Sequence, residues 1–146
     1  MPHVCSLSRV ALLLAAAMLT MSHRNMAGAQ SAATQSKTMP QVGSLARGDA
    51  VLFESRTLKK TGDDITATFR TVFVKPAKAP GGEWFGSRTV VTVRCKAGTA
   101  AVKENRYYSD AKFTKVASEK IVGVPGYAAP VPGSVPAIAF KHLCPS

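Results

Sequence analysis

From Ala50 to Val122 the sequence runs through short stretches in which apolar and polar residues alternate, and the links between these stretches are short. Alternation with a period of two predicts β-strands with one buried face. We predict strands over 50–60, 65–75, 84–95, 101–109 and 112–122. A parallel crossover needs a dozen or more residues, which these links do not supply, so the strands are expected to pair antiparallel.

Two of the predicted strands have clearly different faces. In the strand 65–75, one face carries Ile65, Ala67, Phe69, Thr71 and Phe73, and the other carries Thr66, Thr68 and Arg70. In the strand 84–95, Val91, Val93 and Cys95 share one face, and Val90, Thr92 and Arg94 share the other. We expect the more apolar face of each strand to be buried. The segment from Pro76 to Glu83 is expected to form a loop, because proline cannot donate to a strand ladder.

The C-terminal part of the chain differs from the strands because prolines recur from Pro125 onward. Its last stretch, "PGSVPAIAFKHLC", predicts a short helix with Ser134 as N-cap and Pro136 in the first turn. The residues expected to face the sheet are Ile138, Ala139 and Leu143. The predicted fold class is therefore α+β, a small antiparallel β-sheet of about five to six strands with a C-terminal helix.

Residues 1–29 have the pattern of a cleaved secretory signal peptide. A basic start precedes an apolar run, and Ala27-Gly28-Ala29 fits the small-residue cleavage site before Gln30. The apolar run is shorter than the ~20 residues of a membrane span. Cys5 precedes this run, so it cannot serve as a lipoprotein anchor. We expect residues 30–48 to be a flexible lead-in and residues 49–146 to form a single domain.

Two cysteines, Cys95 and Cys144, remain if the signal peptide is removed. An even pair in an exported chain predicts a disulfide, which would tie the helix to the sheet. A zinc site would need more soft ligands, because His142 is then the one remaining histidine. A catalytic thiol at Cys144 with His142 as its base is the alternative.

The chain is strongly basic, with 19 Lys and Arg against 8 Asp and Glu and a formal net charge of +11. Such a charge favours acidic partners. The candidate binding residues come from neighbouring predicted strands and would form one basic sheet face: Lys59, Lys60, Arg70, Lys75, Arg88 and Arg94. The alternative is a solvated face whose lysines discourage edge-to-edge aggregation.

No catalytic motif stands out in the sequence. There is no nucleophile elbow and no phosphate-binding loop, and Asp63-Asp64 fits a turn. We expect no enzyme activity, no catalytic residues, no metal site and no cofactor; an enzyme that depends on His142 is the alternative. Tyr107, Tyr108, Trp84 and Phe85 could stack bases, but an exported chain argues against nucleic acid as a partner.

The order of four segments resembles the surface-adhesin protein E family of bacterial exported proteins. These segments are "FESRTLKKTGDDITATFRTVF", "GSRTVVTVRC", "RYYSDAKFTKV" and "VPGSVPAIAFKHLC", between Ala50 and Cys144. The resemblance implies an antiparallel sheet packed against a helix, with Cys95 bonded to Cys144. It also implies a non-enzymatic role in binding host or matrix proteins at the bacterial surface.

The expected function is that of an exported binding protein that recognises a protein or an acidic glycan through the basic sheet face. The alternative is a structural periplasmic or envelope protein that binds another envelope component and has no adhesive role. In both cases we expect a protein without a transmembrane segment or lipid anchor that is periplasmic, secreted or associated with the cell surface. The sequence does not predict an oligomeric state.

Overall fold

The computed structural model describes residues 39–145, so the predicted signal peptide lies outside the described residues. Within 39–145 the chain forms six β-strands and then one α-helix. The elements are β1 (Gln41–Ser44), β2 (Ala50–Thr61), β3 (Asp64–Ala79), β4 (Gly82–Arg94), β5 (Thr99–Tyr108), β6 (Val116–Ile121) and α1 (Val135–Leu143). The architecture is therefore mostly β, which corrects the expected α+β class; a nine-residue helix is its α part.

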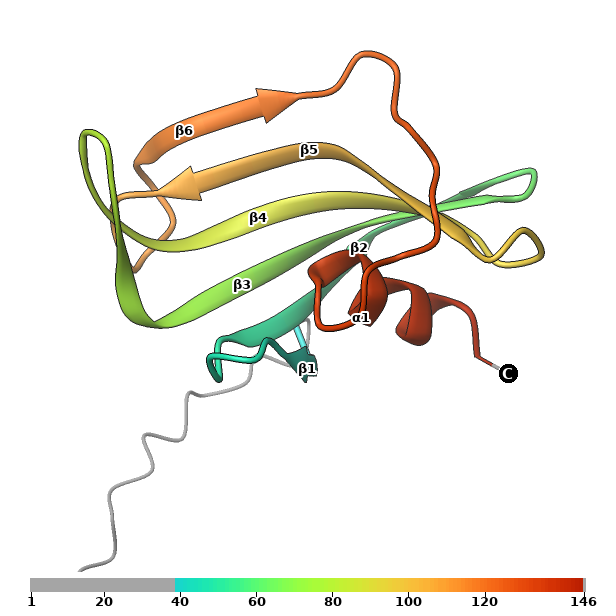
Figure 1. Ribbon diagram of the computed structural model, residues 1–146, viewed down its shortest axis with the longest axis horizontal. Helices are drawn as coiled ribbons and strands as arrows, with labels where there is room; N and C mark the ends of the chain where they lie inside the picture. The colour runs from blue at the N-terminus through green and yellow to red at the C-terminus, as the bar shows by residue number, and fades with distance from the viewer. Residues whose placement is uncertain (1–38, 146) are drawn as a thin grey trace, which may run out of the picture. The chain divides into compact units, whose positions relative to one another are not determined.

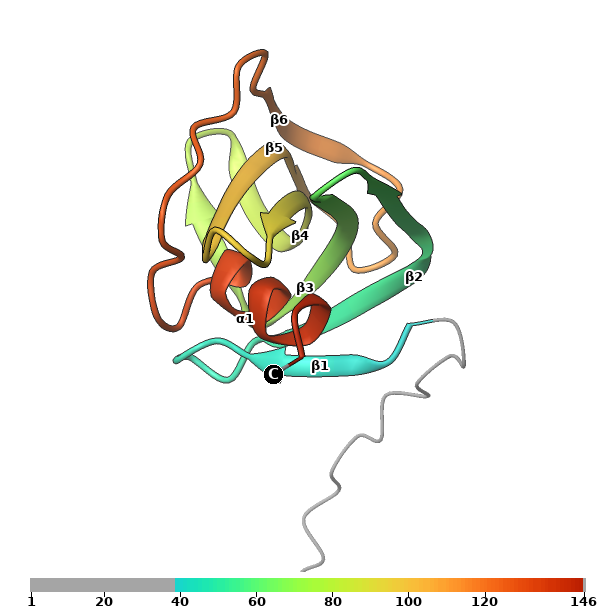
Figure 2. The ribbon, with the colours of Figure 1, turned by 90° about the vertical axis from the view of Figure 1, so that its right-hand side faces the viewer.

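The six strands form one antiparallel sheet in which each strand pairs with the next along the chain, from β1 to β6. Figure 1 shows this order across the sheet, and Figure 2 shows that the sheet curves around α1. The antiparallel pairing that the short links predicted is confirmed. We call the face against which α1 packs the helix face, and the opposite one the arginine face.

Strand β1 corrects the expected flexible lead-in over its last residues. Gln41–Ser44 pairs with β2 along Leu52, Val51 and Ala50, whereas residues 30–38 lie outside the described part. Gly43 allows α1 to lie close to this strand, since a Cβ atom there would be 2.8 Å from Ile138. A polar, glycine-containing stretch is thus ordered by the sheet edge and the helix.

Two strand boundaries also differ from the prediction. β3 continues through Pro76 to Ala79, because the proline falls where the β3–β4 register shifts between Val72 and Ala77. A bulge leaves backbone groups unpaired, so the missing N–H costs no ladder bond there. β6 begins at Val116 rather than at residue 112, because Asp110 accepts backbone N–H bonds from Thr114 and Lys115 and closes a loop.

The core lies between the helix face and α1. It contains Val51, Phe53, Ala67, Phe69, Val91, Val93, Ala100 and Ala139, all buried. Ile138 and Leu143 pack against this cluster, as the sequence predicted. Ser134 caps the helix by accepting from the Ala137 N–H at 3.3 Å, and a proline occupies the first turn. Helix position and cap are therefore confirmed.

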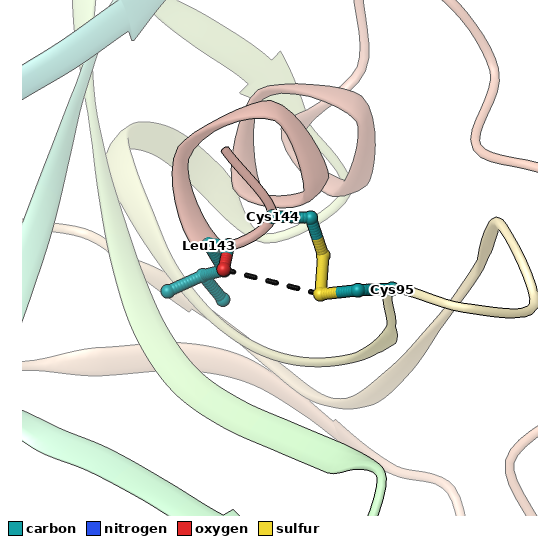
Figure 3. Close-up of a disulfide and its surroundings, with 3 residues drawn as sticks. All are labelled: Cys95, Leu143 and Cys144. Atoms are coloured by element: carbon teal, nitrogen blue, oxygen red, sulfur yellow. Dashed lines mark hydrogen bonds between the residues drawn. A yellow bond between two sulfur atoms is a disulfide. The ribbon is translucent and has the colours of Figure 1, made fainter. Parts of the chain in front are cut away.

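The predicted disulfide between Cys95 and Cys144 is present, with Cα atoms 5.4 Å apart. It joins the residue that follows β4 to the residue that caps the C-terminus of α1 (Figure 3). The Leu143 carbonyl oxygen lies 3.9 Å from Cys95 Sγ. This is a contact rather than a hydrogen bond, because a disulfide sulfur carries no hydrogen. The bridge fixes the end of the helix to the sheet.

Candidate functional site

The arginine face carries a row of side chains at matched positions on the central strands. Arg70 on β3 lies opposite Arg88 on β4, and Arg88 lies opposite Arg106 on β5. Arg106 in turn lies opposite Glu119 on β6. Directly opposed residues of antiparallel strands point to the same face, so three guanidinium groups from three strands meet on one surface.

Glu54 on β2 holds the first two of these arginines together. Arg88 donates to both carboxylate oxygens, at 2.9 Å from Nε and 2.5 Å from Nη2. Arg70 donates to the nearer oxygen Oε1 at 3.3 Å from Nε and 3.2 Å from Nη2. Glu54 is 8% exposed, and its hydrogen bond raises the pKa of the Arg88 guanidinium. A fork-to-fork pair of this kind fixes a guanidinium in direction as well as in position.

Arg106 has the reverse arrangement, with one guanidinium between two carboxylates. Its Nε lies 2.7 Å from Glu104 Oε1 and also donates to Glu119. The hydrogen bond to Glu119 raises the pKa of Arg106. The group of Arg70, Arg88 and Glu54 therefore has one more positive than negative charge, and the group around Arg106 has one more negative than positive charge.

A separate cluster lies at the end of the sheet where β3 begins. Arg94 Nε donates to Asp64 Oδ1 at 2.6 Å, and Tyr127 donates its hydroxyl to Asp64 Oδ2 at 3.0 Å. The Arg94 guanidinium lies over the Tyr127 ring, 3.7 Å from its centre. The hydrogen bond from Arg94 lowers the pKa of Asp64. Desolvation and the bond to Asp64 raise the pKa of Tyr127.

The structure brings together some of the six predicted binding residues and separates the others. Arg70 and Arg88 are adjacent in the central row, and Arg94 lies on the same face in the cluster with Asp64. Lys59 and Lys60 lie beside the β2–β3 turn, opposite Thr66 and Ile65, so their side chains take different faces. Lys75 lies toward the other end of β3. The six residues thus do not form one continuous basic face.

The sequence interpretation missed the carboxylates of this surface. Glu54, Glu104 and Glu119 all come from strands, and each contacts an arginine of the central row. Alternation gave one usable signal, because Glu54 follows the buried Phe53 and must point away from the core. The pairing partners depend on the register, which shifts once within each of the five strand pairs.

Aromatic side chains close one end of the arginine row. The Arg70 guanidinium lies 4.6 Å from the centre of the Phe113 ring, which packs against Tyr108 at 5.0 Å. Phe113 comes from the loop before β6 and has a positive φ of 60°. Gly86 lies below it and has no side chain to displace the ring. The surface therefore combines fixed arginines with an aromatic ring, two kinds of residue that are enriched at protein interfaces.

The residue on which an enzyme would depend, His142, lies edge-on against the Phe53 ring at 4.6 Å. The Cys144 sulfur, which it would have to activate as a thiol, is bonded to Cys95 in the disulfide. Among residues 39–145, no cluster of three or more His, Cys, Asp or Glu side chains has a metal-binding arrangement. Over the same residues, no helix is long and apolar enough to cross a membrane.

Comparison with known proteins gives a similarity at the level of the fold. No family model matches the sequence, and no curated protein matches it. Among solved structures, crystal form II of Haemophilus influenzae protein E is similar, with a TM-score of 0.52 and 8% sequence identity. The similarity covers 75% of this chain and 88% of that chain. At this identity the likeness concerns the fold, and it agrees with the sheet and helix that the sequence resemblance implied.

Proposed function

We propose that this chain is an exported, non-enzymatic binding protein whose arginine face binds an anionic partner, either a protein or an acidic glycan. The observation that carries the proposal is the pair Arg70 and Arg88, which share the carboxylate of Glu54. Their side chains are 24% and 32% exposed. One positive charge of this group is not balanced within it, and it is open to a ligand.

The geometry suits recognition of carboxylate or sulfate groups. Guanidinium groups bind such anions through paired N–H donors, and binding costs less when the donors are already fixed. Glu54 fixes Arg88 through two bonds, and the Phe113 ring lies beside Arg70. The fold similarity to protein E supports a surface-binding role, although the six predicted basic residues do not act as one patch.

The test is binding of the folded protein to immobilised heparin, as an acidic glycan, and to immobilised laminin, as a matrix protein. Both are measured at about 50 mM and about 500 mM NaCl, because salt screens exposed charge contacts. We expect saturable binding to at least one of them that weakens in high salt. Arg70→Gln is expected to weaken this binding, because it removes one positive charge from the arginine face. The fold should be retained, because Glu54 keeps Arg88 as a partner.

Lys75→Gln is the matched control, because it removes the same charge at a distance from the arginine row. Equal losses in Arg70→Gln and Lys75→Gln would contradict a role for the arginine face and indicate a general charge effect. Absence of binding to both ligands, together with co-purification of an envelope component, would support the structural envelope role instead.

A further inference from the structure

A second surface feature lies on the helix face, on the other side of the sheet from the arginines. A cavity of about 360 Å³ opens where α1 no longer covers the strands, which is within the size range of small-molecule sites. Its polar residues form two cross-strand rows: Thr71 opposite Ser87 opposite Tyr107, and Thr89 opposite Asn105. All five line the cavity.

Thr71 shows that this polar surface is not satisfied by the protein. The residue is fully buried, and its hydroxyl oxygen has no hydrogen-bond partner among the described residues. A buried polar group without a partner costs about 1–3 kcal/mol. A valine, which has nearly the same shape as threonine, would avoid that cost, and Thr71 lines the cavity.

The amide of Asn105 is oriented by a neighbour that also lines the cavity. Thr89 donates its hydroxyl to Asn105 Oδ1 at 3.0 Å. An amide held through its oxygen presents its nitrogen as the donor group. Ser87, in the row of Thr71 and Tyr107, is 5% exposed. The cavity thus offers hydroxyl and amide groups on rigid strands, which are precise supports for a binding site.

One wall of the cavity is aromatic and fixed. Tyr107 stacks on Trp84 with ring centres 4.1 Å apart and an angle of 21° between the planes. Phe73, Leu45, Val102 and Pro136 supply further apolar surface. A ligand that fits this cavity must therefore combine apolar C–H surface, to pack on the aromatic and aliphatic side chains, with groups that form hydrogen bonds.

The charged residues at the cavity neutralise one another. Arg47 pairs with Asp49 Oδ2 at 2.9 Å, and the Val74 N–H occupies Asp49 Oδ1 at 2.9 Å. Asp49 is 2% exposed, so it is not available as a separate anionic site. The lining therefore favours an uncharged ligand, in contrast to the arginine face.

We propose that this cavity binds one ring of a neutral saccharide. The sugar hydroxyls would bond to Thr71, Ser87 and Asn105, and the apolar face of the ring would lie against Tyr107 and Phe73. This inference is independent of the arginine face, because the two sites lie on opposite faces of the sheet and take ligands of different charge.

The test is a titration of the folded protein, purified after expression of the full chain, with D-glucose, D-galactose, D-mannose and N-acetyl-D-glucosamine. Amide chemical shifts are followed by NMR, together with the fluorescence of Trp84, the only tryptophan of the sequence. We expect saturable shifts centred on Thr71, Ser87, Asn105 and Tyr107 with at least one sugar, in the millimolar range.

Thr71→Val and Asn105→Ala are each expected to weaken that binding about tenfold, since each removes a hydrogen bond to the sugar. Thr71→Val should raise the melting temperature of the free protein, because it removes the unpartnered hydroxyl. This separates loss of binding from loss of fold. Arg106→Gln, on the opposite face, should bind sugar like the original protein.

Three results would overturn the proposal. One is the absence of saturable shifts with all four sugars. Another is binding by Thr71→Val that equals binding by the original protein. A third is a response of the same amides to n-decanol and not to any sugar, which would assign the cavity to an apolar chain. Heparin binding is not expected to change in Thr71→Val. A failure of the sugar-binding proposal can therefore be distinguished from a failure of the proposal that the arginine face binds anions.

Discussion

Arg70 and Arg88 lie directly opposite each other on β3 and β4, and both donate to the single carboxylate of Glu54. Like charges in directly opposed positions destabilise a sheet. Glu54 offsets that repulsion and holds both guanidinium groups in place. The basic residues of the central strands thus form an ordered, partly compensated surface rather than a diffuse basic patch.

Replacing Glu54 by Gln is expected to lower the free energy of unfolding by about 1–3 kcal/mol, since two partly buried arginines would lose their anion. Urea unfolding followed by circular dichroism measures this. Glu83→Gln is the matched control, because Glu83 is exposed near the β3–β4 turn and should change stability by less than about 0.5 kcal/mol. Equal effects of the two substitutions would rule out a structural role for the Glu54 bonds.

Loss of the disulfide should destabilise the fold substantially. Cys95 and Cys144 are 49 residues apart, and a loop of that size corresponds to about 4 kcal/mol in the chain-entropy model. Urea unfolding should show a lower free energy of unfolding in dithiothreitol than without it. The double variant that combines Cys95→Ser and Cys144→Ser should show the same loss. A urea midpoint that does not change when the disulfide is reduced would contradict its stabilising role.

Gly86→Ala is expected to destabilise the protein by about 1–3 kcal/mol through steric strain. A Cβ atom there would lie 2.3 Å from the Phe113 ring and 2.4 Å from the Thr71 carbonyl oxygen. Gly123→Ala is the control, since a Cβ at Gly123 meets nothing within 4 Å. Thermal unfolding compares the two variants, and equal melting temperatures would show that the loop bearing Phe113 does not pack on β4.

Asp64 should contribute to the loss of stability in acid. Arg94 lowers the pKa of Asp64 in the folded protein, so the unfolded chain binds the proton more readily. The stability from this group is fully present above the unfolded pKa of about 3.9 and is lost as the pH falls through the lower, folded value. Urea denaturation midpoints between neutral pH and pH 2 measure this loss of stability.

In Asp64→Asn the protein should be less stable at neutral pH, and its stability should fall less steeply in acid. Asp63→Asn is the control, because Asp63 is 73% exposed and lies 3.5 Å from an exposed lysine. If Asp64→Asn keeps the acid dependence of the original protein, the acid transition arises from other carboxylates, among them Asp110, whose pKa is also lowered.

Much of the fold was predictable because local patterns carry it. The alternation of Phe69 and Arg70 assigned both faces of β3 correctly, and Ser134 with Pro136 located the start of α1. The cysteine pair followed from the predicted export of the chain and is present. The strand faces and the helix start depend on neighbours in sequence, and the disulfide followed from the number of cysteines, so a single sequence is enough to predict them.

The remaining features depend on contacts between distant residues. β1 forms because Gly43 fits under Ile138, which its own polar sequence does not indicate. Pro76 lies within β3 because a bulge removes the need for its N–H. The pairing of Glu54 with Arg88, 34 residues away, is set by register shifts that no local pattern reveals. Arg70, Arg88 and Arg94 do share one face of the sheet, as the alternation predicted, but the sequence did not reveal their carboxylate partners. That this face binds a ligand stays a prediction.

The most direct test of the arginine face is the heparin affinity of Glu54→Gln against that of Arg70→Gln, measured at low salt in variants shown to be folded. If the face binds anions, Glu54→Gln should bind about fivefold more tightly, because one added net positive charge outweighs the loss of the bonds that fix Arg88. Arg70→Gln should bind more weakly, because it removes a positive charge. Affinities for heparin that are equal in the two variants would contradict the account.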